Sequence, residues 1–246
     1  ESDQSEGVVA GIETACEQAG VEPGEITQFR HATTVATNAL LEKTGAKTAL
    51  VTTEGFGDVL EIGRQDRPAL YDQTVRKPTP LVPEGRRFEV DERATTEGVE
   101  RRMSDDSLEG IIERVDAAAV ESIAVSFLHA YAHPENERRV AAALRERTDT
   151  AVVASHETLA AFREYERTAT TVAEAYLTPV IDRYLARLET EAGERGVPTP
   201  RVMQSNGGIA DVETVRRNAV TTALSGPAAG VVGASLFDPR SHDGSI

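Results

Sequence analysis

The sequence of 246 residues has little cysteine, lysine and aromatic side chain. Cys16 is its one cysteine, so no disulfide can form within the chain, and we expect a reducing, cytoplasmic location. No apolar run approaches the roughly 18 residues of a membrane span. The first residues, Glu-Ser-Asp-Gln, lack the basic-then-apolar pattern of a signal peptide. The sequence therefore predicts neither a membrane protein nor a disulfide-stabilised one.

Positive charge is also scarce, because 26 Lys and Arg residues face 41 Asp and Glu residues, for a net charge of -15. Lysine occurs only at positions 43, 47 and 77. Such a chain repels polyanions and has no basic stripe with interleaved aromatics, so we expect no nucleic-acid partner. An acidic, lysine-poor surface favours a salt-adapted, halophilic source, since salt screens self-repulsion. An ordinary acidic protein from a high-GC mesophile is the alternative.

Strand and helix patterns alternate along most of the chain, which predicts an α/β fold with a mostly parallel sheet and flanking helices. Ligands of such sheets bind beyond the carboxyl ends of the strands. Pro179 should kink or split the longest predicted helix. The predicted strands are 47–53, 87–90, 122–128, 151–155 and 201–204, and the predicted helices are 5–19 with Ser5 as cap, 58–62, 104–119, 134–147, 163–194 and 225–234.

We expect the chain to be a piece of a longer protein. Residue 1 is not methionine, and the first segment is already a helix. The last four residues, Asp243 to Ile246, resemble a turn that enters a strand not present. Residues 68–87 hold four prolines and predict an extended surface connection.

The segment His31-Ala-Thr-Thr-Val-Ala-Thr-Asn38 leads from a strand into a helix that is expected to stop at Gly45. Its hydroxyl, amide and helical N–H groups would suit a phosphate or a polar ring substrate, which makes Thr34 and Asn38 candidate binding residues. Alternatively, threonine is simply a good strand former and Asn38 caps the helix.

A second candidate segment is Thr53-Glu-Gly-Phe-Gly-Asp58, whose glycines free the backbone. Asp58 could hold a substrate amide or act as a base, or it could be a helix cap with no further role. Arg64 and Arg67, with Asp66, could clamp an anion, although a solvated charged turn explains them as well.

Near the carboxyl end, a predicted buried strand stops at Asn206-Gly207-Gly208, where uncovered backbone N–H groups would suit a ligand. A helix rich in glycine and alanine follows from Ser225, with Ser225 or Gly226 at the cap and Pro227 in the first turn. Gly230 costs that helix about 1 kcal/mol relative to alanine unless close packing requires it. We therefore expect this helix to pack closely against neighbouring backbone.

No metal site is expected. The histidines, at positions 31, 129, 133, 156 and 242, show no metal-type spacing. The segment 133–137, His-Pro-Glu-Asn-Glu, is better explained as a helix start. The sequence contains no Walker-type phosphate loop, no Gly-x-Ser-x-Gly elbow and no Cys-x-x-Cys pair.

Five ordered blocks together resemble the hydantoinase A/5-oxoprolinase family, which includes ATP-hydrolysing N-methylhydantoinase subunits. The resemblance implies an incomplete lobe of an actin-like or sugar-kinase-like ATPase of the ribonuclease H-like type. It also implies an amino-terminal region at 1–148 and the start of the family's core at 149–246. The blocks are His31 to Leu41, Val51 to Gln65, Glu164 to Thr171, Gln204 to Gly208 and Ser225 to Gly230.

The resemblance further implies an ATP- and Mg²⁺-dependent hydrolase that opens a hydantoin or 5-oxoproline ring after phosphorylation of the ring carbonyl. The family's two phosphate loops are expected outside this chain, which alone should bind no ATP. A hydantoinase B-like second subunit is an expected partner. The implied positions are Asp58 and Asn206 as catalytic candidates, Thr34, Asn38, Arg64, Gly207 and Gly208 near the substrate, and Ser225, Gly226 and Gly230 at the nucleotide or interlobe side.

Two alternatives remain at this point. An acetone-carboxylase-like subunit would share every motif, and a non-catalytic assembly module would keep the fold without turnover. Asn136 is a departure, since relatives often have histidine there. The difference matters if that histidine takes part in a subgroup's chemistry, and not if it only starts a helix.

Overall fold

The computed structural model describes residues 4–66, 69, 71–72 and 74–236. The chain forms two compact units. The central unit is the continuous segment 45–179, and the terminal unit combines 1–44 with 180–246. The boundary expected near residue 148 comes from the family resemblance. The division into two compact units does not test it, so it stays a prediction.

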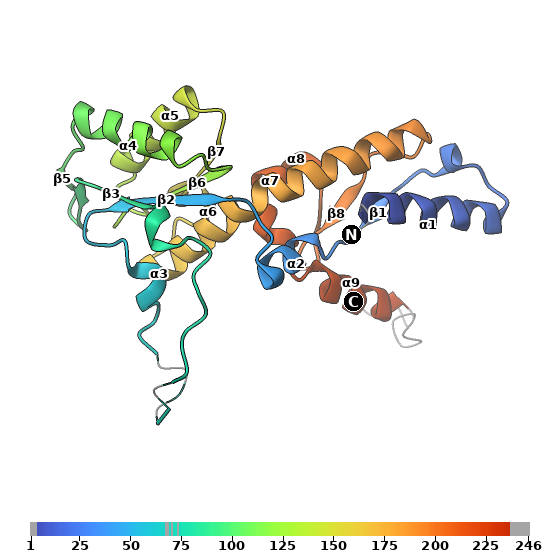
Figure 1. Cartoon of the computed structure of the whole chain (residues 1–246). Coiled ribbons are helices and arrows are strands. Elements are labelled where there is room, and N and C mark those ends of the chain that lie inside the picture. The colour runs from blue at the N-terminus through green and yellow to red at the C-terminus, as the bar shows by residue number, and fades with distance from the viewer. Residues whose placement is uncertain (1–3, 67–68, 70, 73, 237–246) are drawn as a thin grey trace. The chain divides into compact units, whose positions relative to one another are not determined.

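The central unit is built on a four-stranded parallel sheet in the order β3-β2-β6-β7. Every residue of β2 is buried, because helices cover both faces of the sheet. Figure 1 shows α4 and α5 on one face and the first part of α7 on the other. The bounds are β2 Thr48–Thr53, β3 Arg87–Val90, β6 Ser122–Ser126, β7 Ala151–Ala154, α4 Asp105–Ala117, α5 Glu135–Arg147 and α7 Glu164–Glu194.

Side-chain alternation along β2 explains the two layers. Ala49 and Val51 face the cluster under α4 and α5, which also contains Ile123 and Leu144. Leu50 faces the other cluster, in which Leu50, Val82 and Ala124 pack with Val172 and Ala175 of α7. The α/β class with a mostly parallel sheet is thus confirmed.

In the strand order, β2 lies between β3 and β6. The next strand in the sequence, β3, is therefore added on one side of β2, and the later strands β6 and β7 are added on the other. This is a topological switch point, where the carboxyl ends of β2 and β6 favour a crevice. Shorter elements surround this edge or connect the strands. They are α3 (Val59–Ile62), η2 (Glu84–Arg86), the hairpin β4 (Arg93–Ala94) and β5 (Val99–Arg101), and α6 (Ser155–Thr158).

The terminal unit holds a small sheet in which β1 pairs parallel with β8, and β8 pairs antiparallel with β9. Its core includes Val9 and Cys16 of α1, Leu185 and Leu188 of α7, and Val202 of β8. The bounds are α1 Gln4–Ala19, η1 Pro23–Glu25, β1 Arg30–His31, α2 Val35–Glu42, β8 Arg201–Met203, β9 Ile209–Ala210, α8 Val212–Arg217, η3 Ala219–Thr222 and α9 Ser225–Leu236.

Three predicted helix ends were wrong. Ser5 lies inside α1, where its fully buried hydroxyl donates to Glu191 Oε1 at 3.0 Å instead of capping the helix. Helix α2 begins at Val35 after Thr34, so Asn38 is an interior residue and not its cap. The same helix ends at Glu42, where Lys43 adopts a φ of 56°. Gly45 instead leaves room for the Tyr176 ring, since an added Cβ would lie 2.1 Å from Cε1.

Pro179 does not split α7, which runs through it as one helix of 31 residues. Leu177, Ile181 and Leu185 are almost completely buried on either side of the proline. Tertiary packing of this apolar face therefore outweighs the lost backbone hydrogen bond at the proline.

The expected close packing of α9 holds only at its start. A Cβ added to Gly226 would lie 3.5 Å from Thr34 Cγ2, in ordinary contact. Gly230 has no atom within 4 Å of such a Cβ, and the neighbouring Val231 is 72% exposed. Within the described part of the chain, the expectation for Gly230 was therefore wrong. Residues Asp243 to Ile246, and Arg67 of the expected anion clamp, lie outside the described residues.

None of the helices in residues 4–66 and 74–236 combines the length and the apolar character needed to cross a membrane.

Candidate functional site

In the terminal unit, the predicted segment around Thr34 meets the start of α9. Ser225 is buried, and its hydroxyl donates to the Thr33 carbonyl at 3.0 Å. The Leu224 N–H donates to Thr37 Oγ1 at 2.8 Å. Two hydrogen bonds therefore join segments almost 190 residues apart in sequence. Ser225 uses its hydroxyl for this contact, not for the helix cap that the sequence predicted.

Asn38 faces a hollow of about 530 Å³ between α2 and α7. Its Nδ2 lies 3.4 Å from Thr34 Oγ1, so the two candidate binding residues are neighbours. Arg183 and Arg187 of α7 line the same hollow, one helical turn apart. Beside it, His31 Nε2 lies 2.8 Å from the Tyr184 hydroxyl, and burial lowers the pKa of His31.

The Asn206-Gly207-Gly208 segment is a hairpin turn between β8 and β9, an element that sequence reasoning missed. Gly207 has a φ of 82°, which explains the glycine, and its N–H donates to the Gln204 carbonyl at 3.0 Å. The Gly208 N–H donates to Asn206 Oδ1 at 2.8 Å. The expectation of uncovered N–H groups at the two glycines was therefore wrong, because the turn uses them itself.

In the central unit, the loop after β2 binds a carboxylate of its own chain. The Gly55 and Gly57 N–H groups donate to Glu89 Oε2 and Oε1 at 3.1 and 2.9 Å. A Cβ on Gly57 would lie 2.5 Å from Glu89 Oε1, so the second glycine makes room for this carboxylate. Asp58 precedes α3 as its N-cap but makes no side-chain cap hydrogen bond. It is exposed and lines a hollow of about 580 Å³ with Glu89, Arg87 and Arg114.

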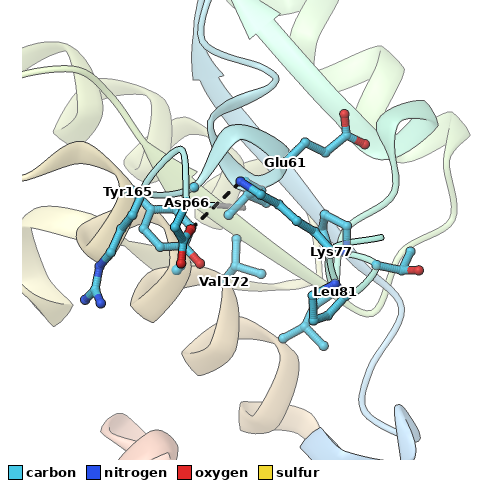
Figure 2. Close-up of a pocket in the computed structure, with 13 residues that line it drawn as sticks. Glu61, Asp66, Lys77, Leu81, Tyr165 and Val172 are labelled. Carbon is cyan, nitrogen blue, oxygen red and sulfur yellow. Dashed lines mark ion pairs between the residues drawn. The ribbon is translucent and has the colours of Figure 1, made fainter. Parts of the chain in front are cut away.

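Arg64 lines a different hollow of the central unit, with a volume of about 650 Å³. Its Nε lies 2.7 Å from Glu166 Oε1, and its side chain is 67% exposed. The hydrogen bond and the charge of Glu166 raise the pKa of Arg64. Figure 2 shows Lys77 and Asp66 facing each other across this hollow, near Tyr165. Arg64 is therefore paired with a carboxylate of its own chain, and its exposure fits the alternative of a solvated charged turn.

The structure thus brings some of the predicted site residues together and separates the others. Thr34, Asn38, Ser225 and Gly226 come together in the terminal unit, whereas Asp58 and Arg64 belong to the central unit and line separate hollows. Gly207 and Gly208 lie in their own hairpin of the terminal unit. A catalytic or binding role for each of these residues stays a prediction.

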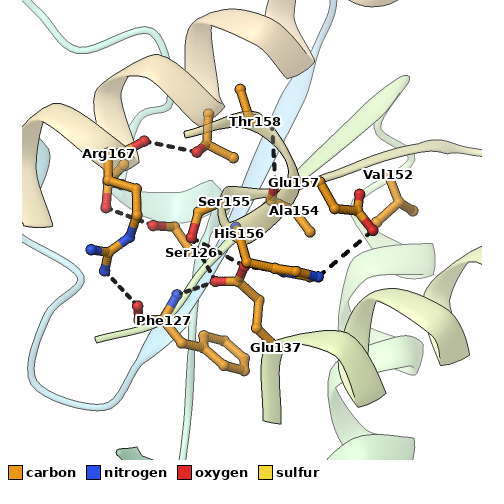
Figure 3. Close-up of polar contacts among 12 residues, drawn as sticks. Ser126, Phe127, Glu137, Val152, Ala154, Ser155, His156, Glu157, Thr158 and Arg167 are labelled. Atoms are coloured by element: carbon orange, nitrogen blue, oxygen red, sulfur yellow. Dashed lines mark hydrogen bonds and ion pairs between the residues drawn. The ribbon is translucent and has the colours of Figure 1, made fainter. Parts of the chain in front are cut away.

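Sequence reasoning missed a buried carboxylate at the carboxyl edge of the parallel sheet. Glu137 of α5 is 1% exposed and accepts hydrogen bonds from the Phe127 N–H at 2.8 Å, the His156 N–H at 2.8 Å and Ser155 Oγ at 2.8 Å. His156 Nδ1 lies 2.7 Å from Glu137 Oε1. Figure 3 shows these groups converging from the ends of β6 and β7. Glu137 therefore ties two neighbouring strand ends together.

A second buried carboxylate lies at the same edge. Glu92, 1% exposed, accepts hydrogen bonds from Thr53 Oγ1 and, at 2.7 Å, from Asn136 Nδ2. The Leu128 N–H in turn donates to Thr53 Oγ1 at 2.9 Å, which links the ends of β2 and β6. Burial raises the pKa of Glu92, although both side-chain hydrogen bonds oppose the shift. Asn136 therefore does more than start a helix, because it supports this carboxylate.

Arg167 of α7 lies beneath the same strand ends with 1% exposure. Its Nη2 donates to the Phe127 carbonyl at 2.7 Å, and its guanidinium carbon lies 5.5 Å from the centre of the Tyr131 ring. Burial lowers the pKa of Arg167. Burial, with the charge of Arg167, also lowers the pKa of His129, whose φ is 57°. A buried guanidinium and an imidazole that favours its neutral form therefore lie close to the switch point of the sheet.

Two signals in the sequence could have found this edge. Ser155 and His156 directly follow the strand 151–154, at the end where α/β sheets bind ligands. Arg167 belongs to the block Glu164 to Thr171 that carried the family resemblance. Among the described residues, no three or more His, Cys, Asp or Glu side chains are grouped so that they could hold a metal ion.

Comparison with known protein families decides the relationship. The family model for the hydantoinase/oxoprolinase N-terminal region matches residues 1–148, and the hydantoinase/oxoprolinase model matches residues 167–245. The chain belongs to the hydantoinase/oxoprolinase family.

Relatives of this hydantoinase/oxoprolinase chain include two with assigned activities. It is 39% identical to the caprolactamase subunit alpha of Pseudomonas jessenii over 80% of this chain and 29% of the relative. It is 32% identical to the 5-oxoprolinase of Saccharomyces cerevisiae, over 85% of this chain and 18% of that enzyme. A protein of Methanocaldococcus jannaschii, MJ0964, is 36% identical over 96% of the chain and 36% of its own length. The chain therefore spans only a fifth to about a third of these relatives.

Two solved structures share the fold of the hydantoinase/oxoprolinase chain. The ATP-dependent caprolactamase from Pseudomonas jessenii superposes with a TM-score of 0.83 and 34% identity, over 93% of this chain and 35% of that one. A nucleotide-free acetone carboxylase gives a TM-score of 0.83 and 27% identity, over 96% of this chain and 36% of the other.

Proposed function

We propose that the protein containing this chain is an ATP-dependent hydrolase that opens a small cyclic amide. The observation that carries the proposal is the similarity to caprolactamase subunit alpha and 5-oxoprolinase, at 39% and 32% identity over at least 80% of the chain. Both names describe opening of a lactam ring. Hydrolysis adds water across the ring C–N bond and yields an open-chain amino acid.

The phosphate loops that the family resemblance implies do not occur in this chain. No Asp-x-Gly-Gly-Thr segment occurs in the sequence, and the one Gly-Gly pair, Gly207-Gly208, uses its N–H groups within its own hairpin. We therefore assign the binding of ATP, and of any Mg²⁺ with it, to parts of the protein beyond these residues. The contribution of this chain is positioning of the substrate and of the segments around it.

The site residues keep their proposed roles with unequal structural support. Asn38 lines a hollow with Thr34 beside it, and Ser225 and Gly226 lie against the same segment, which supports one joint site in the terminal unit. Asp58 is exposed and lines a hollow, as a base or an amide-binding group must. The remaining candidates have less support, because Arg64 is paired with Glu166, Asn206, Gly207 and Gly208 are bonded within their hairpin, and Gly230 has no close neighbour.

A second candidate function is an ATP-dependent carboxylase subunit, favoured by the acetone carboxylase structure at a TM-score of 0.83. In either case we propose a second subunit, since the caprolactamase relative is itself a subunit alpha. A non-catalytic assembly module is the third outcome.

The test measures phosphate release from ATP by the full-length protein, alone and with the proposed second subunit. The added substrates are 5-oxoproline, hydantoin, caprolactam, or acetone with bicarbonate. Stimulation by a cyclic amide, together with the ring-opened product by mass spectrometry, supports the proposal. Stimulation by acetone alone favours the carboxylase. No stimulation by any substrate overturns both and favours the assembly module.

A further inference from the structure

The largest hollow described in the central unit lies beside α7 and is formed by three segments. These are α3 with the turn after it, the stretch around Lys77 to Leu81, and residues 165–172 of α7. Its volume of about 650 Å³ falls in the usual range of small-molecule sites, about 300–1,000 Å³. All of its lining residues belong to the central unit, so its walls are parts of one compact body.

The inner wall of this hollow is apolar and continuous with the core. Val172 is 2% exposed and belongs to the cluster packed between the sheet and α7, and Leu60 and Leu81 pack against that cluster. Figure 2 shows Val172 and Leu81 on this side of the hollow. Side chains anchored in a packed core hold their positions, so the wall offers a fixed apolar surface to a ligand.

The opposite side carries hydrogen-bonding groups. Lys77 Nζ donates to the Ile62 carbonyl at 2.6 Å and lies 4.0 Å from Asp66 Oδ1, which fixes the ammonium at the hollow. A lysine ammonium has three N–H donors, so it can also donate to a ligand. Tyr165 adds a phenol group, and Glu61 and Asp66, which are 54% and 83% exposed, supply acceptors. Donors and acceptors thus lie together beside an apolar wall.

The lining has equal numbers of positive and negative side chains, and this balance indicates which kind of ligand it can bind. Arg64 and Lys77 are opposed by Glu61 and Asp66, so the lining has no net charge in a protein whose net charge is -15. Arg64 is already paired with Glu166. A phosphate or another strongly charged anion would gain little here, because each cation of the lining already has a carboxylate beside it, and Glu61 is itself paired with Arg87. A neutral, amphipathic molecule fits the lining better.

We propose that this hollow binds the cyclic amide, with Lys77 donating a hydrogen bond to the ring carbonyl and the ring methylenes against Leu60, Leu81 and Val172. A lactam offers one carbonyl acceptor, one N–H donor and an apolar ring, which matches the donors, acceptors and wall described above. The inference rests on the proposed function, which it extends from a reaction to a place in the fold. It assigns Lys77 a binding role that nothing in the sequence pattern suggested.

Two variants of the full-length protein test the site from different sides. Lys77→Met removes the donor and keeps the aliphatic stem, and it should raise the KM for the cyclic amide about tenfold, as the loss of one charge-assisted hydrogen bond does. Ala169→Phe places a ring in the hollow from α7 and should raise that KM by at least as much, because it occupies ligand space.

Each variant has a matched control. Lys47 also donates from Nζ to a backbone carbonyl, that of Ala118 at 2.7 Å, and does not line this hollow. Lys47→Met should leave the KM within twofold of the wild type. Ala186 is an exposed residue of the same α7 helix, and Ala186→Phe should likewise have no effect on the KM. Circular dichroism of all four variants checks that they are folded.

The outcomes separate this site from the proposed function. Suppose that the wild type cleaves ATP in response to a cyclic amide, and that Lys77→Met and Ala169→Phe both have the KM of the wild type. The proposed binding site is then wrong, and the proposed function stands. If no cyclic amide stimulates the wild type, calorimetry with hydantoin and caprolactam, which are both uncharged at neutral pH, decides. Binding that Lys77→Met weakens about tenfold supports the site without the function, and absence of binding to the wild type overturns both.

Discussion

Asn136 donates a hydrogen bond from Nδ2 to Oε2 of the buried Glu92 carboxylate over 2.7 Å. Its second Nδ2 contact is the Arg101 carbonyl at 3.0 Å, so the amide joins α5, the second residue after β3 and the β5 strand. The structure gives a physical meaning to the departure at Asn136 that the sequence analysis expected. Any residue here has to support a carboxylate that is almost completely removed from water.

We predict that Asn136→Leu lowers the free energy of unfolding by about 1–3 kcal/mol at neutral pH, because it leaves one oxygen of a buried carboxylate without a donor. Burial already places the pKa of Glu92 above its ordinary 4.5. The folded chain therefore binds a proton at Glu92 more tightly than the unfolded chain does. Protonation of Glu92 stabilises the fold at low pH, and this stabilisation is lost as the pH rises through the raised pKa. The cost of Asn136→Leu should accordingly be smaller below pH 4.5 than at pH 7, as measured by urea unfolding.

The control for this prediction is Glu92→Gln, which removes the titrating group. In the Glu92→Gln background, Asn136→Leu should have the same cost at both pH values. A cost that stays pH-dependent in that background would show that another group is responsible.

Glu137→Gln should destabilise the central unit by about 3–5 kcal/mol, because an amide NH₂ would replace one oxygen among donors from Phe127, Ser155 and His156. Hydrogen exchange should then accelerate at the carboxyl ends of β6 and β7. Glu157→Gln is the control: Glu157 is 46% exposed and pairs with Arg145, and its replacement should cost less than about 1 kcal/mol. Equal costs for the two variants would contradict the proposed role of Glu137.

His31 should titrate below its ordinary pKa of 6.5, because burial disfavours the imidazolium. The folded chain then binds fewer protons than the unfolded chain, so stability is present above pH 6.5 and is lost as the pH falls through the lowered pKa. NMR titration of the His31 ring gives the value directly. Tyr184→Phe removes the 2.8 Å contact but keeps a ring of similar size, and the pKa should stay low. A return to 6.5 in Tyr184→Phe would assign the shift to the hydroxyl instead.

Gly57→Ala should displace the Glu89 carboxylate from the loop after β2, because the added Cβ would lie 2.5 Å from Oε1. The displaced carboxylate loses its hydrogen bonds from both Gly55 and Gly57, so we expect a loss of about 1–2 kcal/mol in the free energy of unfolding. In a double-mutant cycle with Glu89→Ala, the second substitution should add little, since both remove one interaction. Additive costs would mean that Gly57 is required for another reason.

Short apolar runs allowed the sheet of the central unit to be predicted. The strands 48–53, 122–126 and 151–154 are short apolar runs followed by turn residues, and each was found to within two residues at the start and end of the strand. The terminal sheet was harder, because β1 and β9 have two residues each and show no periodicity. The sequence therefore predicts a turn at Asn206 but not the strand β9 that follows it.

The candidate site was less accessible to sequence reasoning, because its contacts join distant parts of the chain. Ser225 and Thr33 are 192 residues apart, and Glu92 and Asn136 are 44 apart. A side chain such as Glu137 looks like an ordinary acidic residue in the first turn of a helix, which it also is. Only the fold shows that it points inward toward two strand ends.

The division of the chain into units has a consequence for its biosynthesis. The segment 45–179 carries every strand of its own sheet and can complete its core as soon as it has left the ribosome. In the other unit, β1, near residue 30, pairs with β8, near residue 201. Its first 44 residues can therefore form this sheet only after the more than 130 intervening residues have been synthesised. We therefore expect the segment 45–179 to form its core before β1 and β8 pair.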